Sequence, residues 1–306
     1  MRMRMRGAML GLAVGDALGA AVEFTPPGEF EPVRDFRDGG PFHLKPGEWT
    51  DDTSMALAMA DSINTTGWCL NDQARRYVAW WQDGKYSVNG RCFDIGNQTR
   101  DALSTFEMVG DARNSASTDP GRSGNGSIMR LAPAAIYAAR HFPHDIPRLA
   151  RIAADSSLPT HGSPQCISAC QYMALVMAGL FHGESKEDVL DPKWEPLTVL
   201  KENVDLHWRI EEIAMGSFRE KEPPEIKGKG WVVQSLEAAL WAFESGDDFE
   251  MSVLAAVNLG DDADTTGAVC GQLAGACWGI DGIPDKWLDG LARREFIDGV
   301  TQRLVG

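Results

Sequence analysis

The sequence predicts an all-α protein. Apolar residues recur at helical spacing along most of the chain, and the alternating Val, Ile and Thr runs that are typical of strands are nearly absent. Helical segments alternate with loops that carry Asp, Gly and His, with no repeat period and no long flexible linker. We therefore expect one domain that covers residues 1–306.

The first expected helix covers residues 6–22, and its glycines fall on one face, which predicts close packing against a neighbouring helix. The alternating Met and Arg at the start of the chain, followed by an apolar run, imitate a secretory signal. Asp16 interrupts that run and amphipathic sequence continues to Phe24, so we interpret the segment as part of the fold. Residues 25–49 are rich in Pro and Gly, which indicates an irregular loop.

Six helices are expected in the middle of the chain: over residues 51–64 and 70–83, between Asp94 and Val109, over residues 128–141, between Pro143 and Asp155, and over residues 165–180. The second of these carries Tyr77, Trp80 and Trp81, which we expect in the core. Pro133 is tolerable in the first turn of the fourth. The sixth is strongly apolar, which predicts a core helix.

Further helical segments are expected over residues 185–218, 231–244 and 249–259, and after the acidic run that follows Gly260. The tail over residues 281–305 is amphipathic and charged. We expect Pro192 and Pro196 to break the first of these segments. Residues 219–230 are charged and contain Pro and Gly, which indicates a loop.

The composition limits the classes of partner. A net charge of −15 argues against nucleic acid or an anionic membrane as the main partner. We expect no membrane-spanning helix. The six cysteines lack Cys-x-x-Cys spacing and the six histidines lack an H-x-x-x-H pair. We therefore expect reduced core thiols in a cytoplasmic protein and no zinc site of the usual kind. A monomer is the default expectation for the oligomeric state.

Two short acidic motifs each precede an apolar helix: residues 50–53 (Thr-Asp-Asp-Thr) and residues 260–267 (Gly-Asp-Asp-Ala-Asp-Thr-Thr-Gly). Asp and Thr commonly cap a first helical turn, so helix capping is one interpretation. A cap needs only one acceptor, however, and adjacent carboxylates repel each other. A hard cation such as Mg²⁺, Mn²⁺ or Ca²⁺ binds carboxylate and hydroxyl oxygens and removes that repulsion. We therefore predict that the two motifs meet at one metal site.

Four other features have a functional and a structural interpretation. Glu23 can face a cleft or solvent, and Asp94 can face a ligand or cap the following helix. Residues 123–127 (Ser-Gly-Asn-Gly-Ser) form a loop that can approach a ligand closely and donate N–H groups to phosphate. His161 stands in a turn between helices, where it can reach a cleft or serve the fold alone.

Taken as a set, these residues resemble the ADP-ribosylglycohydrolase family, and most closely its dinitrogenase-reductase-activating branch. The matching segments follow the family order and span nearly the whole chain: residues 15–19 with Glu23, 45–47, 50–53, 94–97, 124–126 with Met129 and Arg130, 160–161, and 262–267. The two acidic motifs together make the resemblance specific. Asp261 departs from the commoner glycine, which either alters metal preference or places a carboxylate toward solvent.

The resemblance implies an all-α, orthogonal helical bundle with two Mg²⁺ or Mn²⁺ ions in a central cleft. The implied metal ligands are Thr50, Asp51, Asp52, Asp262, Asp264 and Thr265. The family hydrolyses the glycosidic bond that joins ADP-ribose to a protein side chain, here most simply arginine. The expected partners are therefore an ADP-ribosylated protein and ADP-ribose.

The resemblance also implies roles for individual residues. Asp52 and Glu23 are candidates to activate water, and Asp94 to assist ring opening or protonate the leaving group. The implied substrate-binding residues are Gly124, Asn125, Gly126, Ser127, Met129 and His161 along the pyrophosphate and ribose, and Trp231 over the adenine unless it is a core residue.

Two other functions stay open at this point. One is a catalytically silent module that binds ADP-ribose, and the other is a hydrolase of serine-linked, O-acetyl or nucleic-acid-linked ADP-ribose. Inactive members of the family usually lack the acidic motifs, and because both motifs are present here we favour an enzyme over the silent module.

Overall fold

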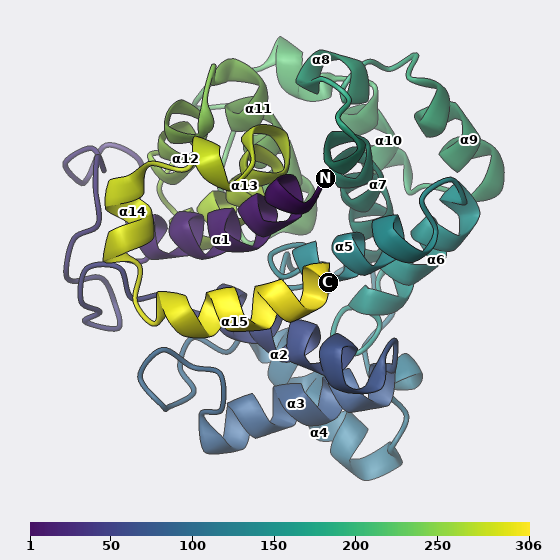
Figure 1. Cartoon of the computed structure of the whole chain (residues 1–306), viewed down its shortest axis with the longest axis horizontal. Coiled ribbons are helices and arrows are strands. Elements are labelled where there is room, and N and C mark those ends of the chain that lie inside the picture. The colour runs from purple at the N-terminus through teal and green to yellow at the C-terminus, as the bar shows by residue number, and fades with distance from the viewer.

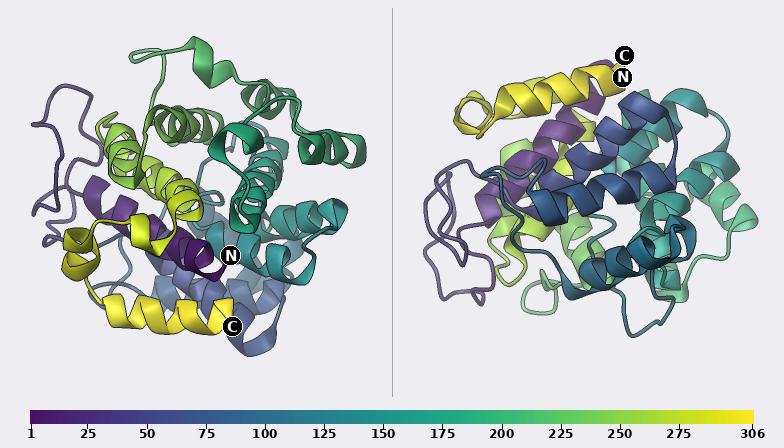
Figure 2. Two further views of the ribbon diagram at one scale, coloured as in Figure 1. Left: turned by 45° about the horizontal axis from the view of Figure 1, so that its top comes forward. Right: turned by 90° about the horizontal axis from the view of Figure 1, so that it is seen from below.

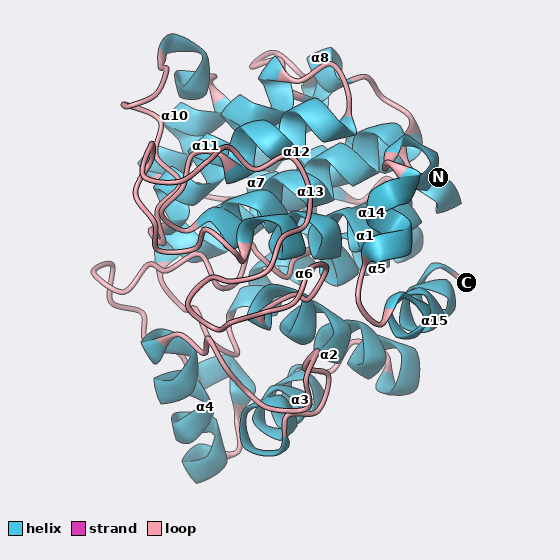
Figure 3. Cartoon of the chain, turned by 90° about the vertical axis from the view of Figure 1, so that its left-hand side faces the viewer, coloured by secondary structure: helices cyan, strands magenta, loops and turns pink.

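The structure, a computed structural model, describes residues 1–306 and confirms the all-α prediction. It contains fifteen α-helices and three short 3-10 helices, and no β-strand is present (Figure 3). The only extended pairings are two isolated bridges, Gly39 with Leu44 and Gly124 with Trp231. The helices cross one another in several directions, as expected for an orthogonal bundle (Figure 1).

The α-helices of the first half are α1 (Arg2–Gly19), α2 (Asp51–Thr66), α3 (Leu70–Asp83), α4 (Asn97–Val109), α5 (Ala132–His141), α6 (Ile146–Ser157) and α7 (Pro164–His182). Those of the second half are α8 (Lys186–Val189), α9 (Glu195–Asn203), α10 (Trp208–Ala214), α11 (Val232–Ser245), α12 (Phe249–Val257), α13 (Ala263–Trp278), α14 (Asp285–Gly290) and α15 (Arg294–Val305). The 3-10 helices are η1 (Ala112–Asn114), η2 (Ser217–Glu220) and η3 (Ile280–Gly282).

Several element boundaries differ from the sequence prediction. Helix α1 begins at Arg2, so the Met-Arg repeat is already helical. Helix α5 begins at Ala132 because residues 126–130 form turns, and Pro133 stands in its first turn. Pro196 also stands in a first turn, where it starts α9 instead of breaking a helix. The N–H groups of a first turn have no intrahelical acceptor, so the N–H that proline lacks is not needed there.

The closest helix pair in the fold is α1 with α13. A Cβ atom at Gly15 would lie 2.0 Å from the carbonyl oxygen of Gly267, and one at Gly271 would lie 2.1 Å from that of Gly11. Backbone therefore touches backbone along the two helices, which confirms that the glycine face packs closely against a neighbour. The contact fixes the C-terminal end of α1 against the N-terminal end of α13.

The end of α1 also meets the start of α2, so both acidic motifs lie beside the same turn of the first helix. A Cβ atom at Gly19 would lie 2.3 Å from the backbone nitrogen of Asp264. The side chain of Asp16, one turn earlier, accepts hydrogen bonds from Thr50 and Thr53. Helix α15 packs against both α1 and α2 (Figure 2).

Helix α7 is long and apolar enough to cross a membrane by length and composition, contrary to the expectation from the sequence. In the fold, 89% of its apolar window is buried, as in the core helix that we predicted for this segment. Cys166 and Cys170 lie on α7 and are buried. All six cysteines are free, but Cys69, Cys92 and Cys277 are half-buried and so lie at the edge of the core.

Candidate active site

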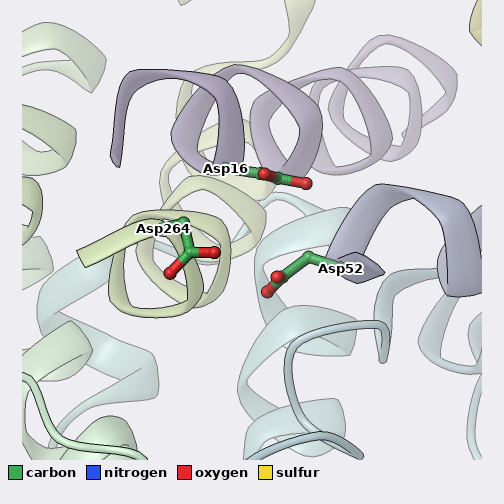
Figure 4. Close-up of side chains that lie close together, drawn as sticks. All are labelled: Asp16, Asp52 and Asp264. Carbon is green, nitrogen blue, oxygen red and sulfur yellow. The ribbon is translucent and has the colours of Figure 1, made fainter. Parts of the chain in front are cut away.

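The two acidic motifs meet at the end of α1. The hydroxyl oxygen of Thr50 lies 2.9 Å from Asp16 Oδ1, 3.1 Å from Asp52 Oδ2 and 3.2 Å from Asp264 Oδ2. Figure 4 shows the three carboxylates pointing toward one another from α1, α2 and α13. A hydroxyl has one proton, so it can donate to only one of these three oxygens at a time. The remaining oxygen contacts require either a proton or a cation.

The capping interpretation of the two motifs is wrong. Thr50 and Asp262 occupy the N-cap positions of α2 and α13, and neither caps its own helix with its side chain. The first turn of α2 is capped instead by Asp16, which accepts from the N–H of Thr50 at 2.8 Å and the N–H of Thr53 at 3.0 Å. Because α1 supplies this cap, the carboxylates of α2 are free to serve the site.

Asp16 is a site residue that the sequence reasoning did not assign. It is fully buried in the apolar, glycine-rich part of α1, which follows Arg6. A charged residue in such a position is rarely left without a partner. That signal was present in the sequence, but its partners come from another helix and so could not be identified.

The carboxylates at the junction carry several oxygens with no hydrogen-bond partner: Asp52 Oδ1, Asp264 Oδ1 and Glu23 Oε2. No Lys or Arg forms an ion pair with any of these groups. Burial raises the pKa of Asp52 and of Asp264 well above the usual range, and neighbouring carboxylates raise each further. Burial alone raises the pKa of Asp16, to about 6, against the lowering effect of its hydrogen bonds. Unpaired buried acids of this kind are costly unless a cation joins them.

The geometry of the oxygens fits divalent cations. Single carboxylate oxygens of Asp16, Asp52 and Asp264 all lie within 4.8 Å of one another, and so do those of Glu23, Asp262 and Asp264. The two groups share Asp264, so they form two adjacent sets of hard oxygen donors.

A cavity of about 290 Å³ opens above these carboxylates and is lined by Glu23, Phe24, Asp51, Asp94, Gly96, Asn97, Gln98, Thr99, Gly124, Asn125, Gly126, Met129, His161, Gly230, Asp262 and Thr265. Most of the predicted site residues therefore meet at one cavity. Thr50, Asp52 and Asp264 lie beneath its floor and are buried. Ser127 is fully buried and is absent from the lining, so its side chain does not face the cavity as predicted.

Asp94 faces the cavity and does not cap a helix. The N-cap of α4 is Gly96, and Asp94 adopts a left-handed backbone conformation with φ of 60°. Burial and the charge of Asp262 raise its pKa to about 7. Glu23 is 4% exposed, and burial together with Asp94 and the other carboxylates raises its pKa to about 10. Both groups can therefore hold a proton near neutral pH when no cation is near.

Residues 123–127, here called the glycine loop, are held in place by hydrogen bonds and by the ring of His161. The N–H of Gly124 donates to Gln98 Oε1 at 3.1 Å, and the amide of Asn125 donates to Asp262 Oδ2 at 2.6 Å. A Cβ atom at Gly126 would lie 2.6 Å from the ring of His161, so this position needs glycine. Burial, with Arg130, lowers the pKa of His161 well below its usual range, so the ring is neutral. It can then exchange a hydrogen bond with a ligand without adding charge.

Trp231 borders a second cavity, of about 420 Å³, that shares Asn97, Gln98, Gly124 and Gly230 with the first. Its indole N–H donates to Gln165 Oε1 at 2.6 Å, and the guanidinium of Arg209 lies 5.1 Å from its ring centroid. Trp231 is half-buried and lines open space, so it is not a core residue. The two cavities share four lining residues, so they adjoin and form one cleft.

Asp261 does not join the acidic cluster through its side chain. Its carboxylate lies 2.7 Å from the ammonium of Lys229, at the edge of the cleft. Its charge still contributes to raising the pKa of Asp262, to about 6, after the larger effect of burial. Asp261 stands where the family commonly has glycine. Its carboxylate is therefore neutralised by Lys229 instead of pointing to open solvent.

Comparisons with known proteins agree with this geometry. A family model described as ADP-ribosylglycohydrolase matches residues 1–306. The ADP-ribosylarginine hydrolase Tri1 of Serratia proteamaculans is 40% identical over 305 residues, which cover 98% of this chain and 78% of that protein. The ADP-ribosyl-[dinitrogen reductase] glycohydrolase of Rhodospirillum rubrum is 32% identical, covering 94% and 90%. A solved ADP-ribosylglycohydrolase-related protein complex has a TM-score of 0.85 at 40% identity and covers 99% of this chain and 97% of its own.

Proposed function

Because the chain belongs to the ADP-ribosylglycohydrolase family, we propose that it hydrolyses the bond between ADP-ribose and an arginine side chain of a target protein. The chain is a hydrolase of that family, and the proposal concerns its linkage and its metal. The choice of arginine is supported by the name of ADP-ribosylarginine hydrolase Tri1, a relative that is 40% identical to this chain. The observation that carries the proposal is the contact of Thr50 with both Asp52 and Asp264, which joins the two acidic motifs.

We propose that the site holds two Mg²⁺ or Mn²⁺ ions. The ions would be held by oxygen atoms of both acidic motifs: Thr50, Asp51 and Asp52 from the first, and Asp262, Asp264 and Thr265 from the second. Asp16 would be an additional buried oxygen donor. The support is the unpaired buried oxygens and the absence of any cationic side chain among them. When bound, such ions supply positive charge that orients ribose hydroxyls and polarises nearby oxygens.

The chain's own groups divide the work of hydrolysis. Water adds to the anomeric carbon of the ribose as the bond to the guanidine nitrogen breaks, and the leaving nitrogen takes a proton. Asp94, whose pKa is about 7, can hold that proton at neutral pH. Asp52 and Glu23 are the candidates to take a proton from water, and a nearby positive charge would lower their raised pKa values for this task. Buried carboxylates also stabilise positive charge that develops on the sugar.

The remainder of the cleft would bind the ADP portion of the substrate. The glycine loop brings backbone close to the cavity at Gly126, and the neutral ring of His161 lies directly behind it. Trp231, held by Gln165 and Arg209 beside the second cavity, offers an aromatic face of the kind on which an adenine stacks. Two adjoining cavities suit an elongated ligand such as ADP-ribose.

The test compares linkages. Proteins carrying ADP-ribose on arginine, serine or aspartate are incubated with the enzyme, with and without Mg²⁺ or Mn²⁺, and released ADP-ribose is measured by mass spectrometry. We expect release from arginine, loss of release with a chelator, and loss with Asp52→Asn. Binding of ADP-ribose without release from any conjugate would identify a silent binding module, and preferred release from serine would overturn the arginine assignment.

A further inference from the structure

Phe24 is an exposed aromatic residue at the mouth of the acidic cavity. Its side chain is 64% exposed, whereas the adjacent Glu23 is 4% exposed, and both line the cavity. Phe24 also has a φ of 61°, in the left-handed region that a bulky residue rarely adopts. A ring that buries little surface gains nothing for the fold from this strained position, so the position itself calls for an explanation.

The strained conformation is held by a second left-handed residue. Asp261 has a φ of 55°, and its backbone carbonyl accepts a hydrogen bond from the N–H of Phe24 at 2.6 Å. The N–H of Asp261 donates to the backbone carbonyl of Thr25 at 2.8 Å. The ion pair of Asp261 with Lys229 fixes this corner from the other side. Strain persists where the surroundings over-determine it, and such places concentrate at ligand clamps.

The two ends of the cleft differ, and Phe24 stands at the end where we expect the target protein. The end near Gly124 and Gly230 continues into the second cavity beside Trp231, and Phe24 does not line that second cavity. If the ADP portion follows the glycine loop toward Trp231, the scissile bond lies over the carboxylates. The leaving group then emerges at the end of the cavity where Phe24 stands.

We propose that Phe24 is a specificity-determining residue whose ring packs against the guanidinium of the ADP-ribosylated arginine. A guanidinium is a flat cation that is attracted to an aromatic face. A serine leaving group offers neither a flat surface nor a charge. The ring therefore favours arginine conjugates over serine conjugates. This inference rests on the proposed function, because it assumes arginine-linked ADP-ribose as the substrate.

The test uses substitutions matched to the backbone. Phe24→Gly removes the ring and accepts a positive φ without strain, Phe24→Tyr keeps the aromatic face, and Phe24→Leu keeps apolar bulk alone. For arginine-linked substrate we expect Phe24→Gly and Phe24→Leu to lower kcat/KM about tenfold, with Phe24→Tyr within about twofold of wild type. The affinity for free ADP-ribose, measured by calorimetry, should stay within about twofold in all three variants, because the ring does not touch the ADP portion.

Two results would overturn the inference. One is wild-type kcat/KM in Phe24→Gly, and the other is an equal loss of ADP-ribose affinity, which would place the ring against the ADP portion or reveal a general disturbance of the cleft. Either result, with normal arginine-linked turnover by the wild type, leaves the proposed function intact. Absence of arginine-linked turnover by the wild type would defeat the proposed function itself and this inference with it.

Discussion

The Oδ2 atom of Asp16 accepts two hydrogen bonds from Thr53, one from its N–H at 3.0 Å and one from its hydroxyl at 2.6 Å. Through this contact and the parallel one with Thr50, a side chain of α1 caps α2. The same helix packs by glycine contacts against α13. One helix therefore aligns both acidic motifs, and the site depends on how firmly α1 is held.

Removing the Asp16 cap should destabilise the fold. Asp16→Ala leaves the buried N–H groups of Thr50 and Thr53 without a partner, so we expect the free energy of unfolding to fall by about 2–4 kcal/mol. Urea denaturation measures the change. The control is Asp248→Ala, which removes an exposed cap from the N–H of Met251 on α12 and should cost about 1 kcal/mol. A loss in Asp16→Ala no larger than in the control would contradict the assignment.

Adding one methyl group between α1 and α13 should have a large effect. The new Cβ in Gly271→Ala would meet the carbonyl oxygen of Gly11, so we expect a loss of at least about 1–3 kcal/mol from overpacking. Gly299→Ala on α15 is the matched control, because its Cβ meets nothing nearer than Arg303 at 3.9 Å. That change should stabilise by about 0.5–1 kcal/mol through helix propensity. Equal melting temperatures for the two variants would refute the close packing.

The metal-free protein should become less stable as pH rises. Burial raises the pKa of Asp16 and of Asp262 to about 6 and that of Asp94 to about 7, above the unfolded values. The folded state then binds more protons than the unfolded state, so stability present at low pH is lost as pH rises through about 6 to 7. Melting temperatures in a chelator, taken between about pH 5 and pH 8, should fall, and added Mn²⁺ should remove most of that fall. The same fall of melting temperature with pH, with and without Mn²⁺, would show that these carboxylates do not bind a cation.

Trp231 should contribute to the binding of ADP-ribose. Because base stacking on an aromatic ring is worth about 1–3 kcal/mol, Trp231→Ala should weaken ADP-ribose binding by about tenfold or more. Trp231→Phe keeps an aromatic face and should lose less. Titration calorimetry gives both constants. Unchanged affinity in Trp231→Ala would remove this residue from the binding site.

The sequence predicted the helices more accurately than the site, and individual residues explain why. Helix α3 begins and ends as predicted, since its apolar face is regular and Gly84 ends it in a left-handed conformation. The predicted start of α5 was wrong because residues 126–130 form turns. Gly126 in these turns packs against His161, a contact that no local pattern reveals. The meeting of the two acidic motifs was predicted from ligand chemistry, which does not depend on the path of the chain.

Two residues at the site could not be found from the sequence. Asp16 owes its role to Thr50 and Thr53 on another helix. Phe24 owes its exposure and its positive φ to backbone bonds with Asp261, far away in the chain. Both depend on tertiary contacts, whereas periodicity and motif spacing report only local structure.

The most direct test is the number of divalent ions that bind to the metal-free protein, measured with Mn²⁺ by equilibrium dialysis for the wild type, Asp52→Asn and Asp264→Asn. We expect about two Mn²⁺ ions per wild-type chain, and weaker or fewer ions in each variant, because each variant removes a buried charged oxygen donor from one of the two motifs. The same number of ions bound with the same affinity in all three proteins, or none bound by the wild type, would contradict the assignment of these motifs to one metal site.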